Sequence, residues 1–254
     1  GSSLDMLYNG LNKRESKESM KTLIIIPAYN ESENLPKLFD ALEKADGDFD
    51  IIVINDCSRD NTEAVCISHN IKVVTLPVNL GIGGAVQTGY RYALYHNYDI
   101  AIQIDGDGQH DPKFIPYLIK RIEEGNHLCI GSRFIENEGF QSSRIRRIGI
   151  KYFSWLIKLL TGILITDPTS GYRACSREVI KLFANDYPKD YPEPETVVTV
   201  LRNKLKVSEM PVIMNAREGG KSSITSLKGI YYMIKVTLAI LIASISRKSV
   251  VKED

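Results

Sequence analysis

The sequence has little cysteine and almost no net charge, and each shortage excludes a class of protein. Its four cysteines show no C-x-x-C spacing and no matching histidine pattern, so we do not expect a zinc site. They indicate buried thiols in a reducing compartment instead. A net charge of +1 gives no global signal for a nucleic-acid or membrane partner, so any basic surface must be local.

The sequence also lacks a long apolar run and a recognisable signal peptide. Gly1–Ser3 resemble the remnant of an expression tag, and the polar stretch to about Ser19 has no apolar core. Val236–Ile245 is apolar but too short to span a membrane. We therefore expect a cytoplasmic protein with three parts: a tag or disordered segment at 1–19, one large domain at 20–225, and an apolar and basic helix at 226–254.

Strand and helix patterns alternate through the first part of the large domain. Four apolar runs predict buried strands at residues 22–26, 50–54, 71–76 and 100–104. Helical apolar spacing follows the first three strands, at residues 34–44, 62–69 and about 85–95. Repeated units of this kind predict a Rossmann-like α/β fold, with a mostly parallel sheet flanked by helices. Ligands of such sheets bind beyond the carboxyl ends of the strands. Polar or glycine-rich turns fall at those ends, at residues 28–31, 56–60, 80–84 and 105–109.

The turn after Ile104 is the strongest indication of chemistry. Asp105 and Asp107 are two residues apart, so on an extended chain their carboxylates point the same way. Two anions this close repel each other unless a cation or a donor-rich ligand lies between them. Gln109 adds a neutral oxygen, and three hard oxygen donors suit Mg2+ or Mn2+, which then binds phosphate. The alternative is an Asp-Gly turn with solvated carboxylates.

The glycine-rich turn at 81–84 begins like a dinucleotide-binding fingerprint. Its third glycine position is occupied by Val86, and the preceding strand is the third rather than the first. Because Asp105 belongs to a carboxylate pair, a metal fits it better than the lone ribose contact of a NAD site. We expect Gly83 and Gly84 to let a nucleotide or pyrophosphate approach a helix N-terminus.

Seven motifs in chain order resemble those of family 2 glycosyltransferases with the GT-A fold, over roughly residues 21–224. Within the family, the chain is most similar to the branch of dolichyl- and undecaprenyl-phosphate sugar synthases. Gly106 and Gly108 depart from the pattern, because many relatives carry alanine and leucine there. The motifs are residues 25–31 (IIPAYNE), 55–62 (NDCSRDNT), 79–84 (NLGIGG), 105–112 (DGDGQHDP), 131–134 (GSRF), 167–173 (DPTSGYR) and 191–195 (YPEPE).

The resemblance implies a donor site for a UDP- or GDP-sugar. Asp56 is expected to bind the base, Asp105 the ribose or the metal, and Asp107 the metal, with Gln109 as a third metal ligand. The base and ribose pocket is expected to be lined by Pro27, Ala28, Tyr29 and Glu31.

On the acceptor side, the groups required depend on the acceptor. A hydroxyl needs a carboxylate base, and the resemblance implies Asp167, Glu193 and Glu195 as candidates. Prolines at 192 and 194 predict an extended segment that keeps both glutamates on one side. A lipid phosphate is already anionic and needs cations instead. The candidates for phosphate binding are Arg133, Arg173, Arg217 and Lys221.

The resemblance implies a metal-dependent hexosyltransferase that moves a sugar, with inversion, from a nucleotide diphosphate to a polyprenyl phosphate at the cytoplasmic face of the membrane. One alternative acceptor is a saccharide or protein hydroxyl, as in capsule, cell-wall polysaccharide or adhesin glycosylation. The other alternative is a non-catalytic scaffold that binds nucleotide-sugars.

Two C-terminal segments indicate contact with a membrane. Residues 141–160 combine five basic residues and no acid with apolar residues and Trp155, the pattern of a helix lying on an anionic bilayer. Packing on the protein's own core, with a solvated basic face, is the alternative. Residues 230–245 predict a membrane-peripheral or oligomer-forming helix. This helix makes a homo-oligomer one expected assembly. Relatives in this branch often add transmembrane helices after the catalytic domain, so the resemblance also implies a small membrane protein as partner.

Overall fold

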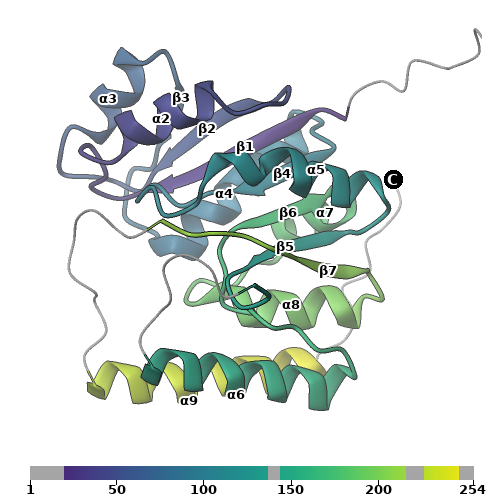
Figure 1. The fold of residues 1–254 in the computed structure, drawn as a ribbon. Helices are drawn as coiled ribbons and strands as arrows, with labels where there is room; N and C mark the ends of the chain where they lie inside the picture. Colours follow the sequence, from purple (N-terminus) through teal and green to yellow (C-terminus); the bar gives the residue numbers. More distant parts are fainter. Residues whose placement is uncertain (1–19, 137–143, 216–225, 246–254) are drawn as a thin grey trace, which may run out of the picture.

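The computed structural model describes residues 20–136, 144–215 and 226–245, and these form a layered α/β fold around one mixed sheet (Figure 1). The strand order is β3-β2-β1-β4-β6-β5-β7. β6 runs antiparallel to both of its neighbours, and the other neighbouring pairs are parallel. The strands are β1 (Thr22–Ala28), β2 (Asp50–Asn55), β3 (Lys72–Thr75), β4 (Ile100–Gln103), β5 (Leu128–Ser132), β6 (Arg173–Ser176) and β7 (Val207–Pro211).

Both faces of the sheet are buried, as the continuous apolar runs require. Successive side chains of β1 enter opposite cores: Leu23 and Ile25 one, Ile24 and Ile26 the other. The core of Leu23 is completed mainly by α4 (Gly81–Tyr95), α7 (Arg177–Asn185) and α8 (Pro192–Arg202). The core of Ile24 is completed by α2 (Leu35–Glu43), α3 (Thr62–Ser68) and α5 (Ile115–Glu123), the last preceded by the 3-10 turn η1 (Pro112–Phe114).

Two long helices, α6 (Arg144–Thr161) and α9 (Ser226–Ile245), form a further layer beyond α8 (Figure 1). The rings of Phe153 and Tyr232 meet edge to face between them, with centroids 5.7 Å apart. Val236 and Ile240 of α9 are buried, whereas many other large apolar side chains of the pair are exposed. Within the described residues, no helix is long and apolar enough to cross a membrane.

The prediction of a mostly parallel α/β sheet flanked by helices is confirmed. Two local predictions are wrong. Helix α4 begins at Gly81, a full turn before the expected start near Ala85. The segment after Tyr191 is the first turn of α8 rather than an extended strand, because Pro192 fits the start of a helix, where its missing N–H costs no hydrogen bond.

Candidate active site

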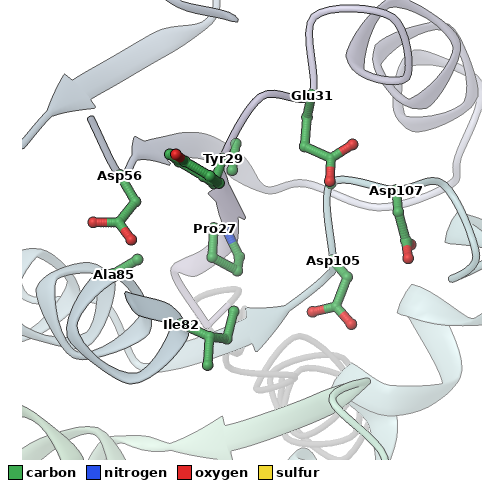
Figure 2. A pocket seen from close by; sticks show the side chains of 10 residues that line it. Pro27, Tyr29, Glu31, Asp56, Ile82, Ala85, Asp105 and Asp107 are labelled. Carbon is green, nitrogen blue, oxygen red and sulfur yellow. The ribbon is translucent and has the colours of Figure 1, made fainter. Parts of the chain in front are cut away.

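A cavity of about 220 Å³ lies at the carboxyl ends of β1, β2 and β4, the edge at which the polar turns were expected to meet (Figure 2). Four of its lining residues are carboxylates, and none of the described lining residues is basic. This lining favours a cation, or an anionic ligand that is accompanied by one. The cavity is lined by Pro27, Ala28, Tyr29, Glu31, Asp56, Ile82, Ala85, Asp105, Gly106 and Asp107.

Asp56 is held by the start of α4. Its Oδ1 accepts the N–H of Leu80 at 2.7 Å, and its Oδ2 accepts the N–H of Gly81 at 2.9 Å. These are N–H groups that a helix N-terminus leaves without internal partners, and the helix dipole favours a negative charge there. Asp56 is buried, and it links β2 rigidly to α4 at the cavity wall.

Glu31 and Tyr29 belong to the turn after β1. Glu31 Oε2 accepts the side-chain N–H of Asn34 at 2.6 Å, and its backbone carbonyl begins the turn into α2. The Tyr29 ring is 45% exposed at the cavity. The structure thus brings together all five residues predicted for the base and ribose pocket: Pro27, Ala28, Tyr29, Glu31 and Asp56.

Asp105 and Asp107 both line the cavity, and Figure 2 shows their carboxylates pointing the same way. Asp107 Oδ1 accepts the backbone N–H of Gln109 at 3.1 Å, which stabilises the turn. The side chain of Gln103 donates to Asp105 Oδ1 at 3.4 Å. A Cβ added to Gly171 would lie 3.2 Å from Asp105 Oδ2, so glycine lets the acceptor-side loop approach this carboxylate.

Asp105 and Asp107 are the cavity carboxylates that the sequence predicted as metal ligands. No cluster of three or more His, Cys, Asp or Glu residues able to hold a metal occurs in the described part of the chain. Two carboxylates suffice for Mg2+ or Mn2+ when phosphate oxygens and water complete the octahedron. Gln109 does not line the cavity, and its role as a third ligand stays a prediction.

His110 is a residue of the site that the sequence reasoning missed. It is buried, stacks on Tyr172 with ring centroids 4.8 Å apart, and accepts the backbone N–H of Asp105 at Nδ1 (3.0 Å). The proton of the neutral ring then lies on Nε2, which is 3.7 Å from Asp105 Oδ2. His110 therefore orients Asp105. Its place directly beyond the carboxylate turn is the sequence signal that could have revealed it.

Gly83 and Gly84 permit close contacts within the protein rather than lining the cavity. A Cβ on Gly83 would lie 2.1 Å from the carbonyl oxygen of Pro188, and its N–H donates to the carbonyl of Lys189 at 3.1 Å. A Cβ on Gly84 would lie 2.4 Å from Leu80 Cβ. These contacts explain the glycines without a ligand, and their predicted donor contact stays a prediction.

Arg133 and Asp167, both predicted for the acceptor side, form a buried ion pair. Arg133 Nε and Nη2 donate to the two carboxylate oxygens of Asp167, each at 2.7 Å, and Asp167 is fully buried. This bidentate geometry orients the guanidinium. It favours a positioning role for Asp167, whose predicted role as a catalytic base stays untested.

Arg173 is also committed to the protein interior. It is 1% exposed, and it donates to the carbonyls of Ser170 and Pro168 and to Thr196 Oγ1 at 2.6–2.8 Å. It therefore braces the acceptor-side loop and the start of α8. The other two predicted phosphate ligands, Arg217 and Lys221, lie outside the described residues.

Glu193 and Glu195 diverge, contrary to the expectation that they point one way. Both occupy the first turn of α8, where residues two apart face nearly opposite sides. Burial raises the pKa of Glu193 above its usual range, Arg173 and Arg146 oppose the increase, and Asp105 adds to it. Burial and then the charge of Asp186 raise the pKa of Glu195. Glu193 therefore lies among the ionisable groups around the site, and Glu195 faces a different neighbour.

Arg146 is a second residue that the sequence reasoning did not select. It lies in the first turn of α6, and its charge reaches both Glu193 and Tyr232, whose pKa values it lowers against the effect of burial. A basic residue on α6 thus acts on Glu193, which was predicted for the acceptor side. The run of basic residues at the start of this helix was the available signal, but the sequence does not show which of them lies close to Glu193.

The fold and the acidic cavity define an α/β protein of the GT-A type. The model of the family described as "Glycosyl transferase family 2" matches residues 23–183, and the chain belongs to this family. It is 30% identical over 219 residues to the polyprenol monophosphomannose synthase of Mycolicibacterium smegmatis, covering 82% of this chain and 83% of the relative.

Two further proteins are similar to this chain. The UDP-N-acetylglucosamine--dolichyl-phosphate N-acetylglucosaminyltransferase of Methanococcus voltae is 30% identical over 210 residues, covering 74% of this chain and 83% of the relative. The glucosyl-3-phosphoglycerate synthase of Mycobacterium tuberculosis, crystallised with Mn2+, UDP-glucose and phosphoglyceric acid, aligns with a TM-score of 0.69. That structure is 20% identical and covers 91% of this chain and 81% of its own, so it shows the shared fold.

Proposed function

We propose that this glycosyltransferase moves a sugar from a UDP- or GDP-sugar to a polyprenyl phosphate, with inversion, at the cytoplasmic face of the membrane. The observation behind the proposal is the division of charge in the site. Four carboxylates line the donor cavity, whereas Arg133, Arg146 and Arg173 lie on the acceptor side. The names of the relatives from M. smegmatis and M. voltae support a polyprenyl or dolichyl phosphate acceptor.

The donor side requires a cation. Asp105 and Asp107 would hold Mg2+ or Mn2+, which supplies Lewis-acid stabilisation of the leaving diphosphate, worth several kcal/mol. His110 and Gln103 keep Asp105 oriented, and the backbone N–H of Gln109 keeps Asp107 in its turn. Asp56, fixed at the start of α4, and the Tyr29 ring would bind the base and ribose.

The acceptor side needs cations rather than a base. A phosphate oxygen is already ionised at neutral pH, so it can attack the anomeric carbon without losing a proton. Arg133, oriented by Asp167, and Arg146 would bring this oxygen toward the donor and reduce its repulsion from the carboxylates. The chain's contribution to this step is position and charge.

The surface of α6 and α9 is where we expect the lipid to arrive. Exposed apolar side chains on both helices accompany the basic residues Arg147, Lys151 and Lys158 of α6, a combination that suits an anionic bilayer surface. We propose that this surface lies against the membrane, alone or with a small membrane protein or a second copy of the chain. The apolar side chains are Ile148, Trp155, Leu159, Tyr231, Ile234, Leu238, Leu241, Ile242 and Ile245.

The test is a screen of nucleotide-sugars with the full chain, a polyprenyl phosphate in mixed vesicles, and Mn2+ or Mg2+. Mass analysis should find one hexose on the lipid phosphate, and the product should disappear with chelator. Binding of nucleotide-sugars without any turnover would favour the scaffold alternative.

A second candidate acceptor is a hydroxyl group, because Glu193 is an acid of raised pKa close to Asp105 and Arg173. Such an acid could serve as the base that a hydroxyl requires. Replacing Glu193 by glutamine should then abolish transfer, whereas the phosphate-acceptor reaction should only weaken. The same substitution at Glu195, which faces Asp186, provides the comparison.

A further inference from the structure

We propose that Glu209 is a positioning residue for the acceptor, which fixes the guanidinium of Arg133 by holding Thr166 and Asp167 in place. The inference rests on the proposed function in one respect, that Arg133 meets the acceptor phosphate. Glu209 lies on β7, opposite Ile130 of β5, and so comes from the edge of the sheet rather than from a motif at the site.

The Glu209 carboxylate makes three hydrogen bonds to two consecutive residues. Its Oε2 accepts the backbone N–H of Thr166 at 2.7 Å. Its Oε1 accepts the Thr166 hydroxyl at 2.9 Å and the backbone N–H of Asp167 at 2.8 Å. Each bond has a charged acceptor, so the three together hold this segment strongly.

The segment that Glu209 holds carries the partner of Arg133. With its backbone fixed, Asp167 accepts hydrogen bonds from Nε and Nη2 of Arg133, at 2.7 Å each. The Asp167 carboxylate also accepts the backbone N–H of Arg133 at 3.2 Å. Thr169 Oγ1 accepts a further proton of Nη2 at 3.0 Å. The guanidinium plane is therefore set by residues that Glu209 places.

A hydroxyl relay connects the same carboxylate to the β5 end. Thr166 Oγ1 donates to Glu209, so it must accept from Ser132 Oγ, which lies 2.7 Å away. Ser132 Oγ in turn accepts the backbone N–H of Phe134 at 3.3 Å. Glu209 thus fixes the backbone on both sides of Arg133 as well as its side-chain partner.

Arg133 lies at the site supported by the Glu209 cluster, which consists of Glu209, Thr166, Asp167 and Ser132. The charge of Asp105 acts on its guanidinium, and Arg133 in turn acts on the Tyr232 hydroxyl of α9. Its guanidinium is therefore close enough to interact electrostatically both with Asp105 of the donor cavity and with Tyr232 of α9. A shift of the guanidinium would change the fit of the acceptor and leave the donor cavity intact, because no residue of the Glu209 cluster lines that cavity.

Glu209→Gln tests this role because the amide keeps the size of the carboxylate but replaces one acceptor with an NH2 donor. Whichever way the amide turns, its NH2 faces an N–H or O–H donor. We expect the KM for the lipid phosphate to rise roughly tenfold, with the KM for the donor unchanged. Glu178→Gln is the matched control, because the Glu178 carboxylate accepts the Ser176 hydroxyl in the first turn of α7 and does not line the donor cavity.

A spectroscopic measurement tests the positioning without any acceptor. The Nε–H signal of Arg133, assigned by its loss in Arg133→Lys, should shift and exchange roughly tenfold faster in Glu209→Gln. It should stay unchanged in Glu178→Gln. Thr166→Val, which replaces the hydroxyl with a methyl group, should shift the Arg133 signal in the same way but by less. It serves as the test if Glu209→Gln does not fold.

The outcomes separate this inference from the proposed function. Three results would each overturn the role of Glu209. They are an unchanged Arg133 signal in Glu209→Gln, equal increases in the KM values for donor and acceptor, and additive effects of Glu209→Gln and Arg133→Lys on the acceptor KM in the double variant. If the signal changes but the wild-type protein transfers nothing to a lipid phosphate, the positioning stands and the proposed acceptor is wrong.

Discussion

Replacing Asp107 by asparagine isolates the charge that the proposed cation needs. Asparagine keeps the size of the side chain and can still accept the backbone N–H of Gln109 through its oxygen, so the turn should persist. Of the four cavity carboxylates, Asp56 is engaged by two N–H groups of α4 and Glu31 by the Asn34 amide. The substitution therefore removes one negative charge from the pair of carboxylates, Asp105 and Asp107, that we propose for the cation.

The expected loss of activity follows from removing one of the two proposed carboxylate ligands. A metal contributes several kcal/mol to the transition state, and losing one of two carboxylate ligands should forfeit roughly 3 kcal/mol, about a hundredfold in kcat/KM. The assay measures the initial rate of sugar transfer at increasing Mn2+ or Mg2+ concentration. In Asp107→Asn, the metal concentration that gives half of the maximal rate should be higher than in wild type. Circular dichroism and the melting temperature should remain near wild type.

Asp111→Asn is the matched control for this prediction. Asp111 is four residues away on the same loop, pairs with Lys113 at 2.9 Å, and does not line the donor cavity. It should transfer sugar at the wild-type rate and with the wild-type metal dependence. If Asp107→Asn also behaves in this way, the reasoning about the cation is refuted.

Three further predictions concern the support of the site. His110→Phe keeps the ring stacked on Tyr172 but removes the acceptor for the Asp105 N–H. We expect kcat/KM to fall about tenfold. Unaltered kinetics would exclude a role for His110 in orienting Asp105. Gly83→Ala drives a Cβ into the Pro188 carbonyl, so calorimetry should show a loss of roughly 1–3 kcal/mol of stability, and an unchanged melting temperature would contradict the close contact. Glu195→Gln should raise the melting temperature at pH 7–8 but not near pH 4. Because the pKa of Glu195 is raised in the folded protein, its ionisation destabilises the fold at pH values above that pKa. At low pH the group is protonated in both the folded and the unfolded state, so this destabilisation is absent. An equal increase in melting temperature at both pH values would contradict this reasoning.

The sequence predicted which residues meet at the cavity, because their positions depend on strand ends. Apolar runs locate β1, β2 and β4, and residues just after such runs must meet at one edge of a parallel sheet. Pro27, Asp56 and Asp105 lie together for this reason.

The acceptor half was harder to predict because tertiary packing decides it. A proline pair at 192 and 194 is compatible with an extended chain or with a first helical turn, and only packing selects the helix, with its opposed glutamates. The pairing of Arg133 with Asp167 spans 34 residues. Glu209 lies still further along the chain, on a strand whose place at the sheet edge no local pattern reveals.

The central claim is that the acceptor is a phosphate, and the most direct measurement compares two lipids that differ only in that group. The full chain is given one nucleotide-sugar, the preferred metal, and equal amounts of a polyprenyl phosphate and the corresponding polyprenol. Products are then quantified by mass spectrometry. The account predicts hexose on the phosphate lipid alone, in wild type and, at a reduced rate, in Glu193→Gln. Transfer to the alcohol, abolished by Glu193→Gln, would contradict it.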